Sequence, residues 1–181
     1  MSSEGHVTRR TLVLGGARSG KSAHAEGLLP AGEEVLYVAT GRRDPSDPEW
    51  TARIDTHIAR RPHTWRTVEA SRELSDVVRA AKGSTLVDDI ATWLTGVMDA
   101  AGAWEGAGLD LVRREGAMLV EAVAATEARV VLVSSEVGLG VVPHTRSGRL
   151  FRDELGALNT ALAQRCDEVL LLVAGIPMRL R

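Results

Sequence analysis

Residues 11–22 read Thr11-Leu12-Val13-Leu14-Gly15-Gly16-Ala17-Arg18-Ser19-Gly20-Lys21-Ser22, and this stretch decides the fold. Its last eight residues fit the pattern G-x-x-x-x-G-K-[ST] of a phosphate-binding loop, the P-loop. The apolar run before the loop predicts a buried strand, and the helix formers after it predict a helix. A chance match in a glycine turn is the alternative, but the matching flanks argue against it. The stretch therefore predicts a site for a nucleoside triphosphate.

Each part of this loop has a predicted role. Its backbone N–H groups would point into one concavity at the positive end of the following helix and hold phosphate oxygens. The ammonium group of Lys21 would reach the β- and γ-phosphates, and the hydroxyl of Ser22 would bind Mg²⁺. The predicted nucleotide-binding residues here are Gly15, Gly16, Ala17, Arg18, Ser19, Gly20, Lys21 and Ser22.

Length and composition restrict the class of protein. The chain has 181 residues, 44% of them hydrophobic and 25% charged, which predicts a globular protein with a loose tail at 1–10 and one domain at 11–181. The net charge of −2 argues against a nucleic-acid partner. The polar start predicts no signal peptide, and no apolar run approaches the length of a membrane span. Because a single cysteine, Cys166, excludes an internal disulfide, we expect a cytoplasmic protein.

Short apolar runs recur along the chain and predict the architecture. Each run is rich in Val and Leu and does not alternate with polar residues, which is typical of strands buried on both faces. Helical spacing lies between the runs, as in 109–123 and 151–162. Strands alternating with helices predict an α/β fold, a three-layer α/β/α P-loop domain around a mostly parallel sheet of about five to seven strands. The predicted strands are Thr11–Leu14, Val35–Ala39, Thr85–Val87, Val130–Val133 and Val169–Val173.

Ligands of such sheets bind beyond the carboxyl ends of the strands, so the residues that follow each strand are candidates. After the second strand, the arginines of the loop Thr40–Arg43 would either contact phosphate or be solvated. Asp88 and Asp89 follow the third strand, and we assign Asp88 to Mg²⁺ or nucleotide and Asp89 to the cap of a helix at 91–98. Glu136, after the fourth strand, would bind a second substrate, orient a loop or be an ordinary turn residue. The fifth run would end in a turn at 174–177.

A histidine lies among arginines in a further predicted helix. Asp47-Pro48-Glu49 is a good helix start, and Pro62 would end the helix. His57 falls between Arg53 and Arg61, at spacings of four residues on either side. One interpretation is a packed histidine beside solvated arginines. The other is a nucleophile for an α-phosphate, because neighbouring cations favour the neutral imidazole and neutralise phosphate charge. His63 is the weaker candidate, and no His/Cys spacing suits a metal.

Several segments resemble one enzyme family in order and spacing. They are Gly15–Ser22, Arg53–His57 with Arg61-Pro62, Trp65–Glu69, Ser134–Pro143, Arg149–Asn159 and Asp167–Pro177. The family is the bifunctional adenosylcobinamide kinase / adenosylcobinamide-phosphate guanylyltransferase of cobalamin biosynthesis. The resemblance extends over nearly the whole chain beyond the tail.

The resemblance implies two reactions. A kinase step with ATP or GTP phosphorylates the aminopropanol hydroxyl of adenosylcobinamide. A histidine then attacks the α-phosphate of GTP and releases pyrophosphate, and the GMP-histidine intermediate gives its GMP to adenosylcobinamide phosphate, forming adenosylcobinamide-GDP. His57 matches this histidine by position, and the family implies a homo-oligomer, a trimer. Beyond the P-loop, the nucleotide contacts implied by the match are Thr40, Gly41, Arg42, Ile58, Ala59, Arg60, Arg61, Glu69 and Asp88.

The chain departs from the family pattern at a few positions. Asp89 stands where the family often has cysteine, and Thr56 where it sometimes has a second histidine next to the one matched by His57. Gly96 and Ser135 stand where asparagine is frequent. Two other functions stay open. A single-function P-loop kinase would need Lys21, Ser22 and Asp88 but not His57, and a nucleotide-binding regulator would bind GTP tightly with little chemistry.

Overall fold

The computed structural model describes residues 9–30, 32–41, 52, 61–70 and 73–181. Within these residues, strands and helices alternate along most of the chain, as the apolar runs predicted. In chain order the elements are β1 (Arg10–Gly15), α1 (Lys21–Gly27), β2 (Val35–Ala39), β3 (Arg66–Glu69), α3 (Leu74–Ala80), β4 (Ser84–Asp88), α4 (Ile90–Ala101), the 3₁₀ helix η1 (Ala103–Glu105), α5 (Leu109–Ala125), β5 (Arg129–Ser135), α6 (Arg146–Arg165), β6 (Glu168–Val173) and β7 (Ile176–Arg179).

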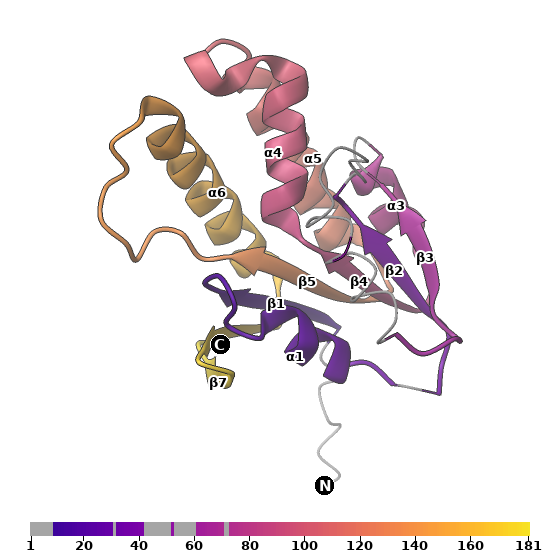
Figure 1. Cartoon of the computed structure of the whole chain (residues 1–181). Helices are drawn as coiled ribbons and strands as arrows, with labels where there is room; N and C mark the ends of the chain where they lie inside the picture. Colours follow the sequence, from indigo (N-terminus) through magenta and orange to yellow (C-terminus); the bar gives the residue numbers. More distant parts are fainter. Residues whose placement is uncertain (1–8, 31, 42–51, 53–60, 71–72) are drawn as a thin grey trace, which may run out of the picture.

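The described strands form one sheet in the order β3-β2-β4-β5-β1-β6-β7. All neighbouring strands run parallel except β6 and β7, which form an antiparallel hairpin at one edge (Figure 1). Each of the five predicted runs is a strand of this sheet. The predicted α/β fold with a mostly parallel sheet is therefore confirmed.

Helices cover both faces of the sheet and make the three predicted layers. In β1, Leu12 and Leu14 face a large core shared with α3, α4, α5 and α6, whereas Val13 faces a smaller core shared with α1. Figure 1 shows α4, α5 and α6 on one side of the sheet and α1 on the other. This division follows from the pleat, because successive side chains of a strand point to opposite faces.

Two strands at the sheet edges, β3 and β7, were not predicted from the sequence. β3 carries exposed, mostly polar side chains, and all four residues of β7 are exposed, so neither presents the buried Val/Leu run that identifies an inner strand. The predicted turn at 174–177 is wrong in extent. Ala174 and Gly175, both with positive φ, form the turn, while Ile176 and Pro177 already belong to β7. Proline fits there because an edge strand leaves one side without ladder hydrogen bonds.

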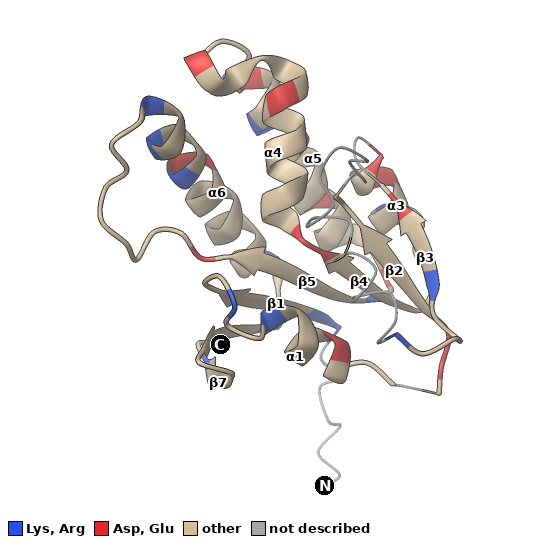
Figure 2. Ribbon diagram, viewed as in Figure 1, with Lys and Arg blue, Asp and Glu red and all other residues tan. Residues whose placement is uncertain are grey.

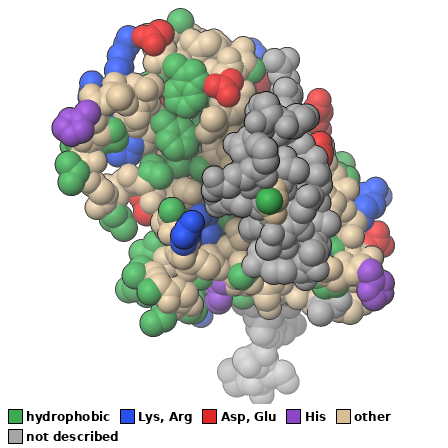
Figure 3. Space-filling model, viewed as in Figure 1, with side chains coloured by type: hydrophobic (Ala, Val, Ile, Leu, Met, Phe, Trp, Pro, Cys, Tyr) green, Lys and Arg blue, Asp and Glu red, His purple; other side chains and the backbone are tan. Residues whose placement is uncertain are grey.

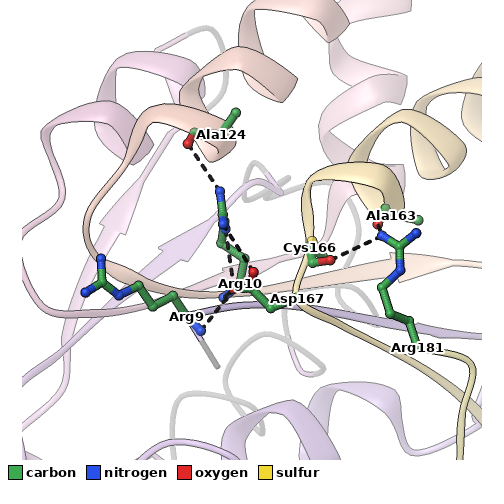
Figure 4. A network of polar contacts seen from close by, with 7 residues as sticks. All are labelled: Arg9, Arg10, Ala124, Ala163, Cys166, Asp167 and Arg181. Atoms are coloured by element: carbon green, nitrogen blue, oxygen red, sulfur yellow. Dashed lines mark hydrogen bonds and ion pairs between the residues drawn. The ribbon is translucent and has the colours of Figure 1, made fainter. Parts of the chain in front are cut away.

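The amino ends of β1 and β6 are tied together by a polar network (Figure 4). The side chain of Arg10 donates to both carboxylate oxygens of Asp167 and to the carbonyl of Ala124, at 3.1 to 3.4 Å. The backbone amides of Arg9 and Arg10 donate to Asp167 as well, at 3.1 and 2.9 Å. Arg181 reaches the carbonyls of Ala163 and Cys166 nearby. Arg10, which we expected in the tail, thus begins β1, while residues 1–8 lie outside the described residues.

Apolar side chains remain exposed on the β6–β7 hairpin and on the loop that follows β5. Figure 3 shows hydrophobic side chains gathered at the lower left of the molecule, where Figure 1 places the hairpin. The exposed large apolar residues of these two segments are Leu139, Val141, Val142, Val173, Ile176, Met178 and Leu180. None of the helices in the described ranges is long and apolar enough to cross a bilayer.

Candidate active site

Strand register brings the candidate residues to the carboxyl edge of the sheet. Ala39, the last residue of β2, pairs with Glu69 on one side and with Asp88 on the other. Gly15 at the end of β1 pairs with Ser135 at the end of β5. The P-loop and the residues after β2, β3, β4 and β5 therefore meet at one edge, as expected for a ligand site in a parallel sheet.

The P-loop joins β1 to α1 by a tight turn. The amide of Ser19 donates to the carbonyl of Gly16 at 3.3 Å, and Gly20, with φ of 87°, occupies the N-cap position of α1. Such a left-handed conformation favours glycine. At Gly15 a side chain would collide with Ser19 and lie 3.0 Å from the carbonyl oxygen of Leu172. Lack of space at position 15 and the left-handed backbone at position 20 therefore both favour glycine.

The β6–β7 hairpin supports the P-loop from the side. The amide of Gly175 donates to the carbonyl of Ser19 at 3.0 Å, and a side chain at Gly20 would contact Gly175. Ser19 itself is buried. The hairpin turn thus holds the middle of the loop in place, a contact that no sequence pattern indicated.

Positive charge lines the P-loop. Figure 2 shows basic residues in the segment that joins β1 to α1. Lys21, the first residue of α1, donates through its ammonium to the carbonyl of Gly16 at 3.3 Å, so its side chain lies folded over the loop. This position suits a group that would neutralise phosphate charge held by the loop.

Ser22 and Asp88 face each other at the foot of the P-loop. The Ser22 hydroxyl donates to Oδ1 of Asp88 at 3.2 Å, and the hydroxyl of Tyr37 donates to Oδ2 of the same carboxylate at 2.7 Å. Hard oxygen donors are what Mg²⁺ prefers, and neighbouring oxygens of an octahedral Mg²⁺ lie about 2.9 Å apart. The Ser22–Asp88 pair fits this ion in both chemistry and spacing. Water and phosphate oxygens would complete the coordination, because Mg²⁺ usually keeps several waters and binds the phosphates of its nucleotide. Among the described residues there is no group of three or more His, Cys, Asp or Glu that could bind a metal.

Asp89 caps α4, as the sequence predicted. Its carboxylate accepts the amide of Thr92 at 2.6 Å, while its backbone carbonyl and amide are both bonded to the Thr40 hydroxyl, at 2.8 and 3.0 Å. Thr40 is buried, and its hydroxyl is used to fix the turn that carries Asp88 and Asp89. The two aspartates therefore have different contacts: Asp89 is the N-cap of α4, and Asp88 accepts a hydrogen bond from Ser22.

Arg61 lies over the ring of Tyr37. Its guanidinium carbon is 3.3 Å from the ring centroid, and it donates to the hydroxyl of Thr67 at 3.1 Å. Burial and the negative charge of Asp88 raise the pKa of Tyr37 well above its usual value. Tyr37 was missed in the sequence because an aromatic residue in a buried strand gives no signal beyond packing. Glu69 ends β3 as an exposed residue, paired with Ala39 of β2.

Several predicted site residues lie outside the described residues. These are Arg42, His57, Ile58, Ala59 and Arg60. Their roles, and those of the described nucleotide contacts, stay predictions.

The segment after β5 is tied to the P-loop strand. The amide of Glu136 donates to the carbonyl of Gly15 at 3.1 Å, and its carboxylate accepts the amide of Gly138 at 2.6 Å. Glu136 thus organises its own loop, one of the roles left open by the sequence. Behind it, buried Asn159 of α6 accepts from the Ser134 hydroxyl at 2.7 Å and donates to the carbonyl of Ser135 at 3.0 Å. In the sequence, Asn159 stood at the end of the segment Arg149–Asn159 that resembles the family, but nothing there indicated its contact with β5.

Comparison with known proteins agrees with this geometry. A family model described as cobinamide kinase / cobinamide phosphate guanyltransferase matches residues 11–180. The chain is 40% identical to the bifunctional adenosylcobalamin biosynthesis protein CobU of Salmonella typhimurium, over 94% of this chain and 98% of that protein. It is 38% identical to the protein of the same name from Escherichia coli, with the same coverage. It is 41% identical to the corresponding protein CobP of Pseudomonas aeruginosa, over 95% and 97% of the two chains.

Proposed function

The chain belongs to the cobinamide kinase / cobinamide phosphate guanyltransferase family of cobalamin biosynthesis, and we propose that both of its reactions use the P-loop site described above. The observation that carries the proposal is the Ser22–Asp88 pair, 3.2 Å apart at the foot of a complete P-loop. The kinase and guanylyltransferase activities imply nucleoside triphosphate substrates. We assign GTP to the transfer step, ATP or GTP to the kinase step, and adenosylcobinamide and its phosphate to the acceptor side.

In the kinase step, the loop amides would hold the β- and γ-phosphates, and Lys21 would neutralise their charge. Ser22 and Asp88 would hold Mg²⁺, which when bound supplies further positive charge to the phosphate oxygens. The aminopropanol hydroxyl of the corrinoid attacks the γ-phosphorus, and the bond from that phosphorus to the β-phosphate oxygen breaks. The hydroxyl proton passes to solvent water, and the nucleoside diphosphate is released.

In the transfer step, we propose His57 as the nucleophile. A ring nitrogen of neutral His57 attacks the α-phosphorus of GTP, the bond to the β-phosphate oxygen breaks, and pyrophosphate leaves. A phosphate oxygen of the cobinamide phosphate then attacks the same phosphorus, the nitrogen–phosphorus bond breaks, and the imidazole is regenerated. Arg61, four residues after His57 in the chain, stacks on Tyr37, whose hydroxyl donates to Asp88, and this contact supports the proposal.

Two variants with a matched control test these assignments. His57→Ala is expected to abolish guanylyl transfer and leave the kinase rate largely intact, because the imidazole enters only one of the two reactions. Lys21→Ala should slow both reactions, by about a hundredfold or more, because it removes charge stabilisation shared by both. His63→Ala is the control histidine and should leave both rates near those of the unmodified enzyme. Equal loss of both activities in His57→Ala would contradict the assignment.

Two broader expectations remain proposals. The resemblance implies a homotrimer, for which the exposed apolar residues of the β6–β7 hairpin would be a suitable contact surface. A cytoplasmic location likewise stays a prediction. Sedimentation equilibrium measures the oligomeric state directly.

A further inference from the structure

Tyr37 lies at the centre of β2, where its hydroxyl meets the carboxylate of Asp88. The side chain is 2% exposed and packs in the core beneath α1, with its ring 6.4 Å from that of Trp65. Its hydroxyl donates to Oδ2 of Asp88 at 2.7 Å, a shorter contact than the one of 3.2 Å between the Ser22 hydroxyl and Oδ1. Asp88 is thus held at one oxygen by a rigid strand residue, while its other oxygen faces Ser22.

The direction of this hydrogen bond is fixed by chemistry. An ordinary tyrosine phenol, with a pKa of about 10, carries its proton near neutral pH, and an ionised carboxylate can only accept, so the contact at 2.7 Å has the Tyr37 hydroxyl as its donor. A phenol that keeps its proton donates to the carboxylate and leaves Oδ1 as the oxygen presented toward Ser22. Mg²⁺ demands near-ideal octahedral geometry, so a carboxylate with a fixed plane and one oriented oxygen suits it better than one free to rotate.

The ring of Tyr37 is itself held in place. Arg61 stacks on its face with the guanidinium carbon 3.3 Å from the centroid, and Arg61 is anchored in turn by the Thr67 hydroxyl of β3. A cation over an aromatic face is attractive, and more so when shielded from water. Contacts therefore run without a break from Arg61 through Tyr37 and Asp88 to Ser22.

We propose that Tyr37 is the positioning residue of the metal-binding carboxylate: by donating to Oδ2 it orients Oδ1 of Asp88 for the Mg²⁺ of the nucleotide. Arg61 stacks on the ring that carries the hydroxyl and so restricts the orientation of that ring. This inference rests on the proposed role of Asp88 and adds to it a residue that does not touch substrate.

The test is Tyr37→Phe, which removes only the hydroxyl. The ring, its packing against Trp65 and its stacking with Arg61 all remain, so the variant should fold with nearly unchanged thermal stability. The first readout is the affinity of Mn²⁺ for the protein–GDP complex, followed by the electron paramagnetic resonance of free Mn²⁺, which needs no turnover. The second is the Mg²⁺ concentration that gives half-maximal kinase rate.

Tyr37→Phe is expected to weaken Mn²⁺ binding and raise the Mg²⁺ midpoint by about tenfold each, the size expected for a hydrogen bond to a charged group. At saturating Mg²⁺ the maximal rate should recover. Thr160→Val is the matched control, because it removes a hydroxyl that only donates within α6, to the carbonyl of Gly156. It should leave both quantities unchanged.

Asp88→Asn separates this inference from the proposed function. If Asp88→Asn binds Mn²⁺ and turns over normally, the metal role of Asp88 itself is wrong. If Asp88→Asn loses metal but Tyr37→Phe changes Mn²⁺ affinity by less than about threefold, the site stands and the positioning role is overturned. In the double variant the effect of Tyr37→Phe should vanish, because Tyr37 is proposed to act only through Asp88. An undiminished effect there would also contradict the inference.

Discussion

At the scale of single residues, some charged side chains of this chain stabilise the fold and others belong to the candidate active site. Asp167 belongs to the first kind, at the amino ends of the strands, and Asp88 to the second, at the carboxyl ends. Partial burial acts to raise the pKa of Asp167, but the hydrogen bonds from Arg10 and from the amides of Arg9 and Arg10 outweigh it and hold the pKa below its usual value. The ionised form therefore stabilises the folded state.

Replacing Asp167 by Asn should lower the free energy of unfolding by about 1 to 2 kcal/mol at pH 7, an amount moderated by solvent because the pair is partly exposed. Because the folded pKa is the lower one, the contribution is fully present above the unfolded value of about 3.9 and disappears as the pH falls through the folded pKa. Urea unfolding of both proteins from pH 7 downward measures this. A difference that grows toward acid pH would contradict the account.

At the scale of elements, α4 shows how much the sequence specifies locally. Its cap, Asp89, and its start were predictable because an aspartate before a helical run is a strong local signal. The inner strands were predictable from their Val and Leu runs. In contrast, β3 and β7 lie at edges, where burial no longer selects the residues. The contact of Tyr37 with Asp88 depends on the register of β2 against β4, which no local pattern encodes.

Substitution of Asp89 should affect stability, whereas substitution of Asp88 should affect the Mg²⁺ dependence of the kinase. Asp89→Ala should lower the free energy of unfolding by about 1 kcal/mol through loss of the α4 cap, with the Mg²⁺ midpoint of the kinase little changed. Asp89→Ser, which keeps a capping oxygen, should recover most of that stability. Thermal or urea unfolding together with a Mg²⁺ titration checks this. A large rise in the Mg²⁺ midpoint for Asp89→Ala would mean that the metal role belongs to Asp89.

At the scale of the whole molecule, helices cover both faces of the sheet, and the single cysteine of the chain is buried. Cys166 lies between α6 and β6, 4% exposed, and burial raises the pKa of its thiol to about 12. Since only the thiolate reacts with disulfide reagents, the folded protein should be nearly inert to them at pH 8. Reaction rates measured in rising urea should follow the unfolding transition. Rapid labelling of the folded protein would contradict the packing described for this end of the sheet.

The central claim of the account is that His57, which matches the guanylylated histidine of the family by position, carries the transfer reaction. The most direct measurement is a mass spectrum of the protein after incubation with Mg²⁺, GTP and pyrophosphatase, followed by peptide mapping. The account predicts a GMP adduct on His57 that is labile in acid, stable in base and absent from His57→Ala. An enzyme that phosphorylates adenosylcobinamide under the same conditions but forms no adduct, or forms it elsewhere, would contradict the claim that His57 carries the transfer reaction.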